Sequence, residues 1–355
     1  MLTLRIDAAR WRAHHRAVLS AERDLVPVVK GNGYGVGRAR LFEEVRALES
    51  DVGVDLVAVG TYAEAREALA VLTRRVLVLT PWRAADATYD SRLVHTVSRL
   101  ADVSALAAAD RAAGPAHVLL EGLTTMRRHG VAQAQVGELV AAVRAAGDRL
   151  EVEGLALHQP IDRHDAVHPV EESAGWIEAV TGAGLPLSSV FVSHLEPAEV
   201  ADLSARFPSV RVRPRVGTRL WLGDRGALRA TATVLDAHAV RRGDRYGYRQ
   251  RRAPSAGWIV VVGGGTANGI GLEAPRSPRG LVGRGRALAL GGLEAGGLAL
   301  SPYHWQGKQR WFAEPPHMQV SLLFLPQRVA PPPIGVELDV DVRMTISTFD
   351  EVEST

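Results

Sequence analysis

The feature that constrains this chain most is a regular alternation of apolar runs and amphipathic stretches between residues 25 and 217. Short β-branched runs, typical of buried strands, are each followed by a segment of helical periodicity. Eight such units in about 200 residues indicate an α/β fold, a parallel (β/α)8 TIM barrel, while the count leaves an open doubly wound sheet as the competing arrangement. The predicted strands are 25–29, 54–60, 75–80, 93–98, 116–123, 150–159, 188–194 and 210–217.

The pattern changes near residue 224, and the sequence predicts two domains, a barrel over 1–223 and an all-β domain over 224–355. Residues 2–7 alternate like a strand and are expected to join the β domain, and Asp7 is the expected N-cap of a helix over 8–22. No helix is predicted beyond 224, where Gly/Pro turns separate strand-like segments. These segments are 227–240, 258–265, 281–292, 317–326 and 336–347.

Composition excludes several classes of function. The 42 Lys and Arg residues and 39 Asp and Glu residues are interspersed, which argues against a nucleic-acid surface. No cysteine is present, so disulfides, thiolate nucleophiles and zinc-ribbon sites are excluded. The N-terminus lacks the apolar segment of a signal peptide and no run approaches a membrane span. We therefore expect a cytoplasmic protein that contacts neither membrane nor nucleic acid.

A single lysine ends the first predicted barrel strand. The apolar run 25–29 leads into Lys30, and the only other lysine of this arginine-rich chain is Lys308. An amine on a flexible stem can lose its proton when desolvated and attack a carbonyl, whereas a guanidinium stays charged. A lysine at the mouth of a barrel therefore suits a covalent imine, although a solvated residue after a core strand is the alternative.

Residues 28–35, VVKGNGYG, resemble the motif around the pyridoxal 5′-phosphate (PLP) lysine of the alanine racemases. The resemblance implies that Lys30 binds PLP and serves as a catalytic base. It also implies that the Tyr34 hydroxyl and the backbone amides of Gly217 and Thr218 donate hydrogen bonds to the phosphate. A soluble homodimer with shared active sites is the expected assembly.

Four basic side chains follow or end consecutive predicted barrel strands, where barrel enzymes carry their reactive groups. They are Arg128, His158, His194 and Arg215. By resemblance, Arg215 lies opposite the pyridine nitrogen and keeps it unprotonated, which disfavours side reactions such as transamination. His194 is expected to orient Arg215, and His158 to lie near the cofactor ring.

Residues 125–130, TMRRHG, resemble a second family motif and place Arg128 beside the phenolic oxygen of PLP, on the substrate side with Met318. Many family members carry a carbamylated lysine five residues before the methionine of this motif. Glu121 occupies that position here and is expected to supply the same negative charge to Arg128. The second catalytic base is expected to be Tyr248, from the partner subunit, with Tyr246 as the alternative if the register differs by two.

The resemblance weakens in the β domain, where the chain has Thr266 and Thr348 in place of family tyrosines and Gln319 in place of an aspartate. The phosphate-binding serine expected after His194 is also missing. These losses are mostly on the substrate and entrance side, and they predict a pocket more open than one specific for alanine.

The resulting hypothesis is a PLP-dependent amino-acid racemase with a two-base Lys/Tyr mechanism, supplying D-alanine as a peptidoglycan precursor. The alternatives are a PLP-dependent amino-acid decarboxylase and a non-catalytic, regulatory PLP-binding homologue.

Overall fold

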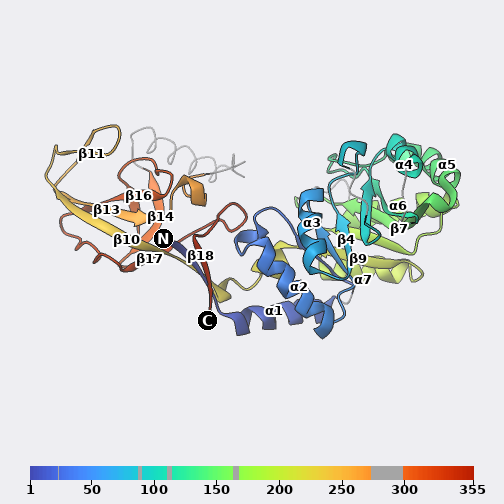
Figure 1. Ribbon diagram of the computed structural model, residues 1–355, viewed down its shortest axis with the longest axis horizontal. Coiled ribbons are helices and arrows are strands. Elements are labelled where there is room, and N and C mark those ends of the chain that lie inside the picture. The colour runs from blue at the N-terminus through green and yellow to red at the C-terminus, as the bar shows by residue number, and fades with distance from the viewer. Residues whose placement is uncertain (23, 87–89, 110–113, 163–167, 273–298) are drawn as a thin grey trace. The chain divides into compact units, whose positions relative to one another are not determined.

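The computed structural model describes residues 1–355 except 23, 87–89, 110–113, 163–167 and 273–298 (Figure 1). The chain divides into two compact units. The barrel unit consists of Ala13–Gly33 and Arg38–Gly223, and the β unit consists of Met1–Arg12, Tyr34–Gly37 and Asp224–Thr355. The chain therefore leaves the barrel unit after Gly33, within residues 30–37, which we call the lysine loop, and returns to it at Arg38.

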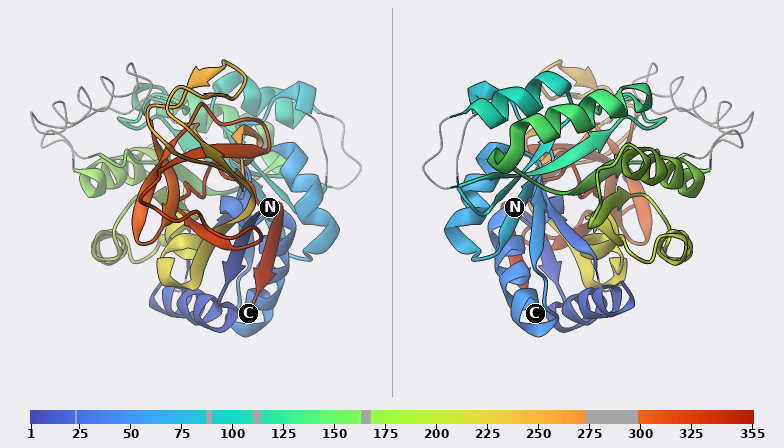
Figure 2. Two further views of the ribbon diagram at one scale, coloured as in Figure 1. Left: turned by 90° about the vertical axis from the view of Figure 1, so that its left-hand side faces the viewer. Right: turned by 90° about the vertical axis from the view of Figure 1, so that its right-hand side faces the viewer.

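The barrel unit is a closed ring of eight parallel strands, which confirms the predicted TIM barrel (Figure 2). The first strand pairs with the last through Val26 and Arg215, so an open doubly wound sheet is excluded. The strands are β2 (Val26–Val29), β3 (Leu56–Val59), β4 (Arg75–Val78), β5 (Leu93–Val97), β6 (Ala116–Gly122), β7 (Leu150–His158), β8 (Ser189–Ser193) and β9 (Arg211–Val216).

Helices cover the outside of this ring, and most lie where helical periodicity predicted them (Figure 1). Asp7 caps α1 as expected, because its Oδ1 accepts the Arg10 N–H at 3.0 Å. The short α8 after the last strand was not predicted. The helices are α1 (Ala8–Ala21), α2 (Arg38–Asp51), α3 (Tyr62–Val71), α4 (Leu100–Ala108), α5 (Val136–Ala146), α6 (Pro169–Gly182), α7 (Pro197–Arg206) and α8 (Thr218–Leu222).

The barrel interior is an apolar layer that includes Val28, Leu119, Ala156 and Phe191. Side chains alternate along a strand, so the residue two positions further on again points inward and lies closer to the C-terminal mouth. These next positions are Lys30, Glu121, His158 and Ser193. The fold thus brings polar residues from four strands to one end of a packed apolar core.

The β unit contains an eight-stranded sheet in which β13 pairs with both β16 and β10, so that six strands close into a ring. All pairings are antiparallel except that of β1 with β18. The strands are β1 (Leu2–Ile6), β10 (Leu228–Val240), β13 (Gly257–Gly263), β14 (Leu300–Trp305), β15 (Lys308–Phe312), β16 (Val320–Pro326), β17 (Glu337–Val340) and β18 (Glu351–Ser354), with a separate hairpin of β11 (Arg245–Tyr246) and β12 (Arg251–Arg252).

The strand predictions for the β unit were partly wrong. Strands β14, β15 and β18 were missed, and the predicted strand 336–347 is ordered as a strand only over Glu337–Val340. The predicted strand 281–292 lies outside the described residues.

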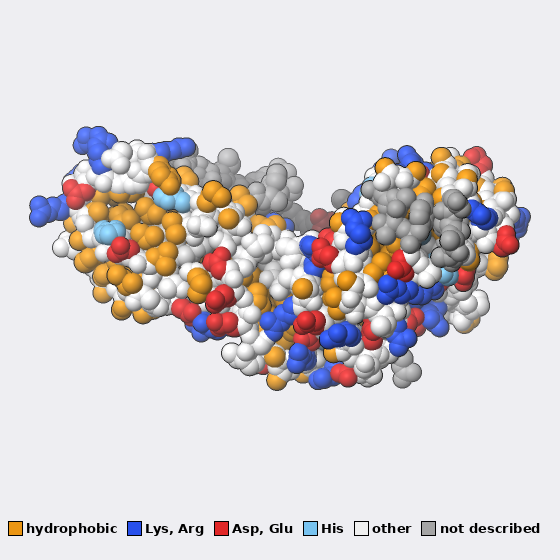
Figure 3. Space-filling model, viewed as in Figure 1, with side chains coloured by type: hydrophobic (Ala, Val, Ile, Leu, Met, Phe, Trp, Pro, Cys, Tyr) orange, Lys and Arg blue, Asp and Glu red, His pale blue; other side chains and the backbone are white. Residues whose placement is uncertain are grey.

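Side chains of Leu2, Val262, Tyr303 and Leu323 form the core of the β unit. Hydrophobic side chains also gather on its visible face (Figure 3).

None of the helices in the described part of the chain has the length and apolar character needed to cross a membrane.

Candidate active site

The lysine loop begins where β2 ends, and its backbone depends on glycine. Gly31 and Gly33 have left-handed φ angles of 62° and 63°. A Cβ atom on Gly33 would lie 2.4 Å from the backbone nitrogen of Arg38, so no larger residue fits there. Trp221 of α8 anchors the strand below the loop, because its indole N–H donates to the Val28 carbonyl at 2.8 Å. The left-handed glycines and this close packing therefore restrict the backbone conformation of the loop.

Lys30 is exposed at the barrel mouth and is surrounded by cationic groups. Partial burial of the amine lowers its pKa, and the positive charges of Arg128 and Arg215 lower it further. The negative charge of Glu64 raises it. The amine therefore becomes neutral, and nucleophilic, at a lower pH than an ordinary lysine does.

Arg215 is buried inside the barrel, and the hydrogen-bonding capacity of its guanidinium is only partly satisfied. Its Nη2 donates to the Leu157 carbonyl at 2.9 Å. Its Nε–H has no hydrogen-bond partner among the described residues. Burial lowers the pKa of Arg215 to about 10, and the side chain remains a cation at neutral pH. A buried N–H without an acceptor is costly, which indicates that a further group belongs beside it.

Glu121 is buried on the inner face of β6, as its apolar surroundings indicated. Burial raises the pKa of its carboxyl, and the positive charges of Arg215, Arg128 and Arg83, in that order, oppose the rise. Its Oε2 has no hydrogen-bond partner in the part of the chain that is described. The sequence paired Glu121 with Arg128, whereas Arg215 is the arginine that acts on it most.

The two predicted histidines lie together at the ends of β7 and β8. Their rings are 5.1 Å apart in an edge-on arrangement. His158 Nδ1 forms a hydrogen bond with the Ser193 hydroxyl at 2.8 Å. Burial lowers the pKa of His158 to about 2, with Arg215 as the next cause, and burial followed by the positive charge of Lys30 lowers that of His194. Both imidazoles are therefore neutral at physiological pH.

His194 also has an unusual backbone conformation, with φ of 60°. Left-handed backbone is uncommon outside glycine and tends to occur at functional sites. That His194 orients Arg215 stays a prediction, and Nη2 of Arg215 donates to the Leu157 carbonyl.

The remaining predicted residues lie in two places. In the barrel unit, Arg128 is exposed on the loop after β6, Gly217 precedes α8 and Thr218 is exposed at its first position. Arg128 contributes its charge to the pKa values of Lys30, His158, His194 and Arg215. The remaining predicted residues, Tyr34, Tyr246, Tyr248 and Met318, belong to the β unit.

The two candidate tyrosines differ in the state of their hydroxyl groups. The Tyr246 hydroxyl donates to the Ala313 carbonyl at 3.1 Å, and burial raises its pKa. Tyr248 is 83% exposed. Its ring lies 4.2 Å from that of His317, and its backbone N–H donates to Glu314 Oε1 at 3.2 Å. Tyr248 thus presents its hydroxyl to solvent while its ring and backbone are held.

Sequence reasoning missed three residues that support these groups: Glu64, Ser193 and Glu314. Glu314 is buried, and its Oε1 lies 2.6 Å from Nε2 of His317. The ring of His317 in turn packs against the ring of Tyr248. The signal for Glu64 was present, because Thr61-x-x-Glu64 has the spacing of a capping box. Ser193 is 35 residues from His158 and Glu314 is 66 residues from Tyr248, so no local pattern links either residue to the group it supports.

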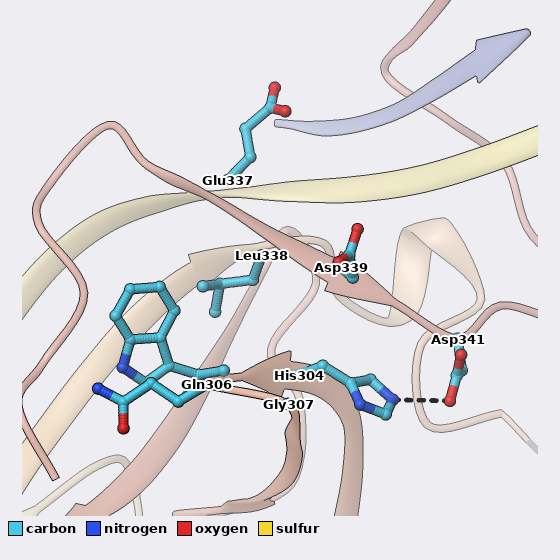
Figure 4. Close-up of a pocket in the computed structure, with 8 residues that line it drawn as sticks. His304, Gln306, Gly307, Glu337, Leu338, Asp339 and Asp341 are labelled. Atoms are coloured by element: carbon cyan, nitrogen blue, oxygen red, sulfur yellow. Dashed lines mark hydrogen bonds and ion pairs between the residues drawn. The ribbon is translucent and has the colours of Figure 1, made fainter.

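The β unit has a polar hollow of about 400 Å³ lined by His304, Glu337, Asp339 and Asp341 among other residues (Figure 4). Each of these three carboxylates already has a hydrogen-bonding partner. Glu337 pairs with Arg5, Asp339 with Arg229 at 2.8 Å, and Asp341 forms a hydrogen bond with His304 at 2.8 Å. We regard these contacts as part of the sheet surface.

Comparison with known proteins identifies the family. A search of curated protein sequences finds no match. Among solved structures, alanine racemase from Streptomyces lavendulae, a D-cycloserine producer, is 21% identical with a TM-score of 0.67, covering 100% of this chain and 97% of its own. Biosynthetic alanine racemase from Pseudomonas aeruginosa is 19% identical with a TM-score of 0.68, covering 100% and 99%.

Alanine racemase from Bartonella henselae, solved with covalently bound pyridoxal phosphate, is 16% identical with a TM-score of 0.69, covering 100% and 99%. At these identities the structures show a shared fold. The profile of the family described as "Alanine racemase, N-terminal domain" matches residues 6–184, about half of the chain. This chain therefore belongs to the alanine racemase family, as a divergent member.

Proposed function

We propose that this protein is a PLP-dependent racemase that interconverts the L- and D-forms of alanine or of a related small amino acid. The observation that carries the proposal is the Lys30 amine, whose pKa is lowered by its surroundings and by Arg128 and Arg215, at the C-terminal mouth of a (β/α)8 barrel. D-alanine made in this way would serve as a peptidoglycan precursor.

The residues at the barrel mouth fit PLP chemically. The unsatisfied Nε–H of Arg215 needs an acceptor, and a pyridine nitrogen is one. Arg215 keeps its proton at neutral pH, so it would hold that nitrogen by donation without protonating it. Lys30 would bind the aldehyde carbon, Arg128 the phenolic oxygen, and Gly217, Thr218 and Tyr34 the phosphate.

PLP, when bound, supplies an electron sink that acidifies the α-proton of the amino acid. The chain must then remove this proton from one face and return it on the other. Lys30, as a neutral amine, accepts the proton at Nζ on its own face. His158 and His194, both neutral, add no further positive charge beside this amine.

The second face requires a group from the β unit, and we assign it to Tyr248 of a partner subunit in a homodimer. Exposed apolar side chains on the β unit support an interface, with Tyr248, Met318 and Ile334 exposed by 83%, 73% and 65%. Contiguous apolar surface is what marks a contact surface, and hydrophobic side chains gather on the visible face of this unit (Figure 3). We also propose that the protein is cytoplasmic.

The substrate is tested by incubating the protein and PLP with a panel of amino acids in heavy water. The family tyrosine positions Thr266 and Thr348 lie together here, because the Thr348 hydroxyl donates to the carbonyl of Ala267 at 3.0 Å. Two short side chains at one place leave room, so we expect α-deuterium in L- and D-alanine and comparable exchange in serine or a larger amino acid, measured by NMR.

The panel also separates the alternatives. Release of carbon dioxide would identify a decarboxylase, and PLP binding without exchange would identify a non-catalytic homologue. Exchange confined to alanine would leave the racemase standing and refute the more open pocket.

The choice between the two tyrosines is tested by Tyr248→Phe and Tyr246→Phe. We expect Tyr248→Phe to lower racemisation about 100-fold or more, because a positioned base contributes that much. Tyr246→Phe should keep most of the activity, because its hydroxyl already donates to a backbone carbonyl. Rates with each enantiomer are measured by circular dichroism, and the reverse order of effects would move the second base to Tyr246.

A further inference from the structure

The Glu64 carboxylate joins the lysine loop to the neighbouring βα turn. Its Oε1 accepts the Gly31 N–H at 2.9 Å, and its Oε2 accepts the N–H groups of Gly60 at 2.6 Å and Thr61 at 3.2 Å. Glu64 is buried, with 8% of its surface exposed. Charge-assisted hydrogen bonds of this kind are stronger than neutral ones. One buried side chain thus holds backbone groups of two βα turns, the turn that follows Lys30 and the turn after β3.

Capping alone does not account for this arrangement. Glu64 is the third residue of α3, and with Thr61 it forms a capping box, which explains the bond to the Thr61 N–H. The bond to Gly31 reaches a different βα unit, 33 residues away in sequence. That bond does nothing for the end of α3, and its effect falls on the residue that follows Lys30.

The lysine loop needs such a restraint because glycines at 31 and 33 leave its backbone free in the unfolded and unrestrained states. Glu64 and Lys30 both pack closely against Gly60. A Cβ atom placed on Gly60 would lie 2.7 Å from Glu64 Oε2 and 3.2 Å from the Cβ of Lys30. The stem of Lys30 and the carboxylate of Glu64 therefore both press against Gly60.

Glu64 also acts on Lys30 through its charge. The charged groups that face the amine are Arg128, Arg215 and Glu64, with the neutral imidazoles of His158 and His194 nearby. Both arginines lower the pKa of Lys30 and Glu64 raises it. The carboxylate therefore limits how far the arginines depress it.

We propose that Glu64 is a positioning residue for Lys30, which fixes the lysine loop through the Gly31 N–H and balances the positive charge at the barrel mouth. This inference rests on the proposed function for its importance in turnover, since an amine displaced by about 1 Å loses much of its effectiveness as a base.

The test exploits the two lysines of the chain. The protein without added PLP is reductively methylated at its amines with ¹³C-formaldehyde and a borohydride reductant, so that Lys30, Lys308 and the N-terminus are followed by NMR as the pH is raised. We expect Glu64→Gln to shift the Lys30 titration to lower pH, because a negative charge is lost, and to leave Lys308 unchanged. Glu64→Asp, which keeps the charge on a shorter side chain, should restore the Lys30 titration.

Glu199→Gln is the matched control, because Glu199 holds the equivalent capping position of α7 and accepts the Glu196 N–H at 2.7 Å. With PLP and the preferred amino acid, we expect kcat to fall about 10- to 100-fold in Glu64→Gln and in Glu64→Asp, and to change little in Glu199→Gln. A Lys30 titration in Glu64→Gln that matches the wild type would refute the inference, whether or not the protein proves to be a racemase. So would a normal kcat in an active enzyme carrying Glu64→Gln.

Discussion

Lys30→Ala protein is expected to lose the visible absorption that PLP gives when it is bound to an enzyme lysine, and with it at least about 10³-fold of racemase activity. The amine of Lys30 has a lowered pKa and lies among Arg128 and Arg215, and alanine offers no nucleophile in its place. The measurement is a titration of the cofactor-free protein with PLP, followed by its visible spectrum and by reduction with borohydride and mass mapping of the labelled peptide.

Lys308→Ala is the matched control, because Lys308 is the only other lysine and is exposed on β15. It should bind PLP like the wild type. A visible band that persists in Lys30→Ala but disappears in Lys308→Ala would show that the resemblance around residues 28–35 had led to the wrong amine.

A mixture of inactive Lys30→Ala and Tyr248→Phe proteins is expected to regain about a quarter of the wild-type activity after subunit exchange, on statistical reassortment of a two-fold dimer. Half of the dimers would then carry one of each subunit, and in these one site combines an intact Lys30 with an intact Tyr248. Activity is measured before and after exchange, with mass spectrometry to count mixed dimers.

The double variant Lys30→Ala/Tyr248→Phe mixed with wild type supplies the control, since every mixed dimer then has one damaged residue in each site. Absence of recovery in the first mixture, with mixed dimers present, would contradict the shared site. In that case Lys30 and Tyr248 of one site would belong to the same subunit.

The sequence by itself determined the eight strand–helix units and the polar residues at the ends of their strands, because both follow from short-range patterns, and it left a closed barrel and an open sheet as alternatives. Strand and helix periodicities differ, so the eight units could be counted along the chain. Alternation along each strand then assigns Lys30, Glu121 and His158 to the inner face, two residues beyond apolar interior positions such as Val28, Leu119 and Ala156. The parallel ring closes through β2 and β9, which only long-range pairing decides.

The tertiary structure alone decided which partners these residues have. The bond from the Gly31 N–H to Glu64 and the bond between His158 and Ser193 join different βα units, and the contact of Tyr248 with Glu314 joins segments 66 residues apart. Strands β14, β15 and β18 also escaped prediction, because their polar, mixed sequences become strands only when neighbouring backbones satisfy their hydrogen bonds. Local sequence specifies periodicity, while contacts between distant segments depend on how the elements pack.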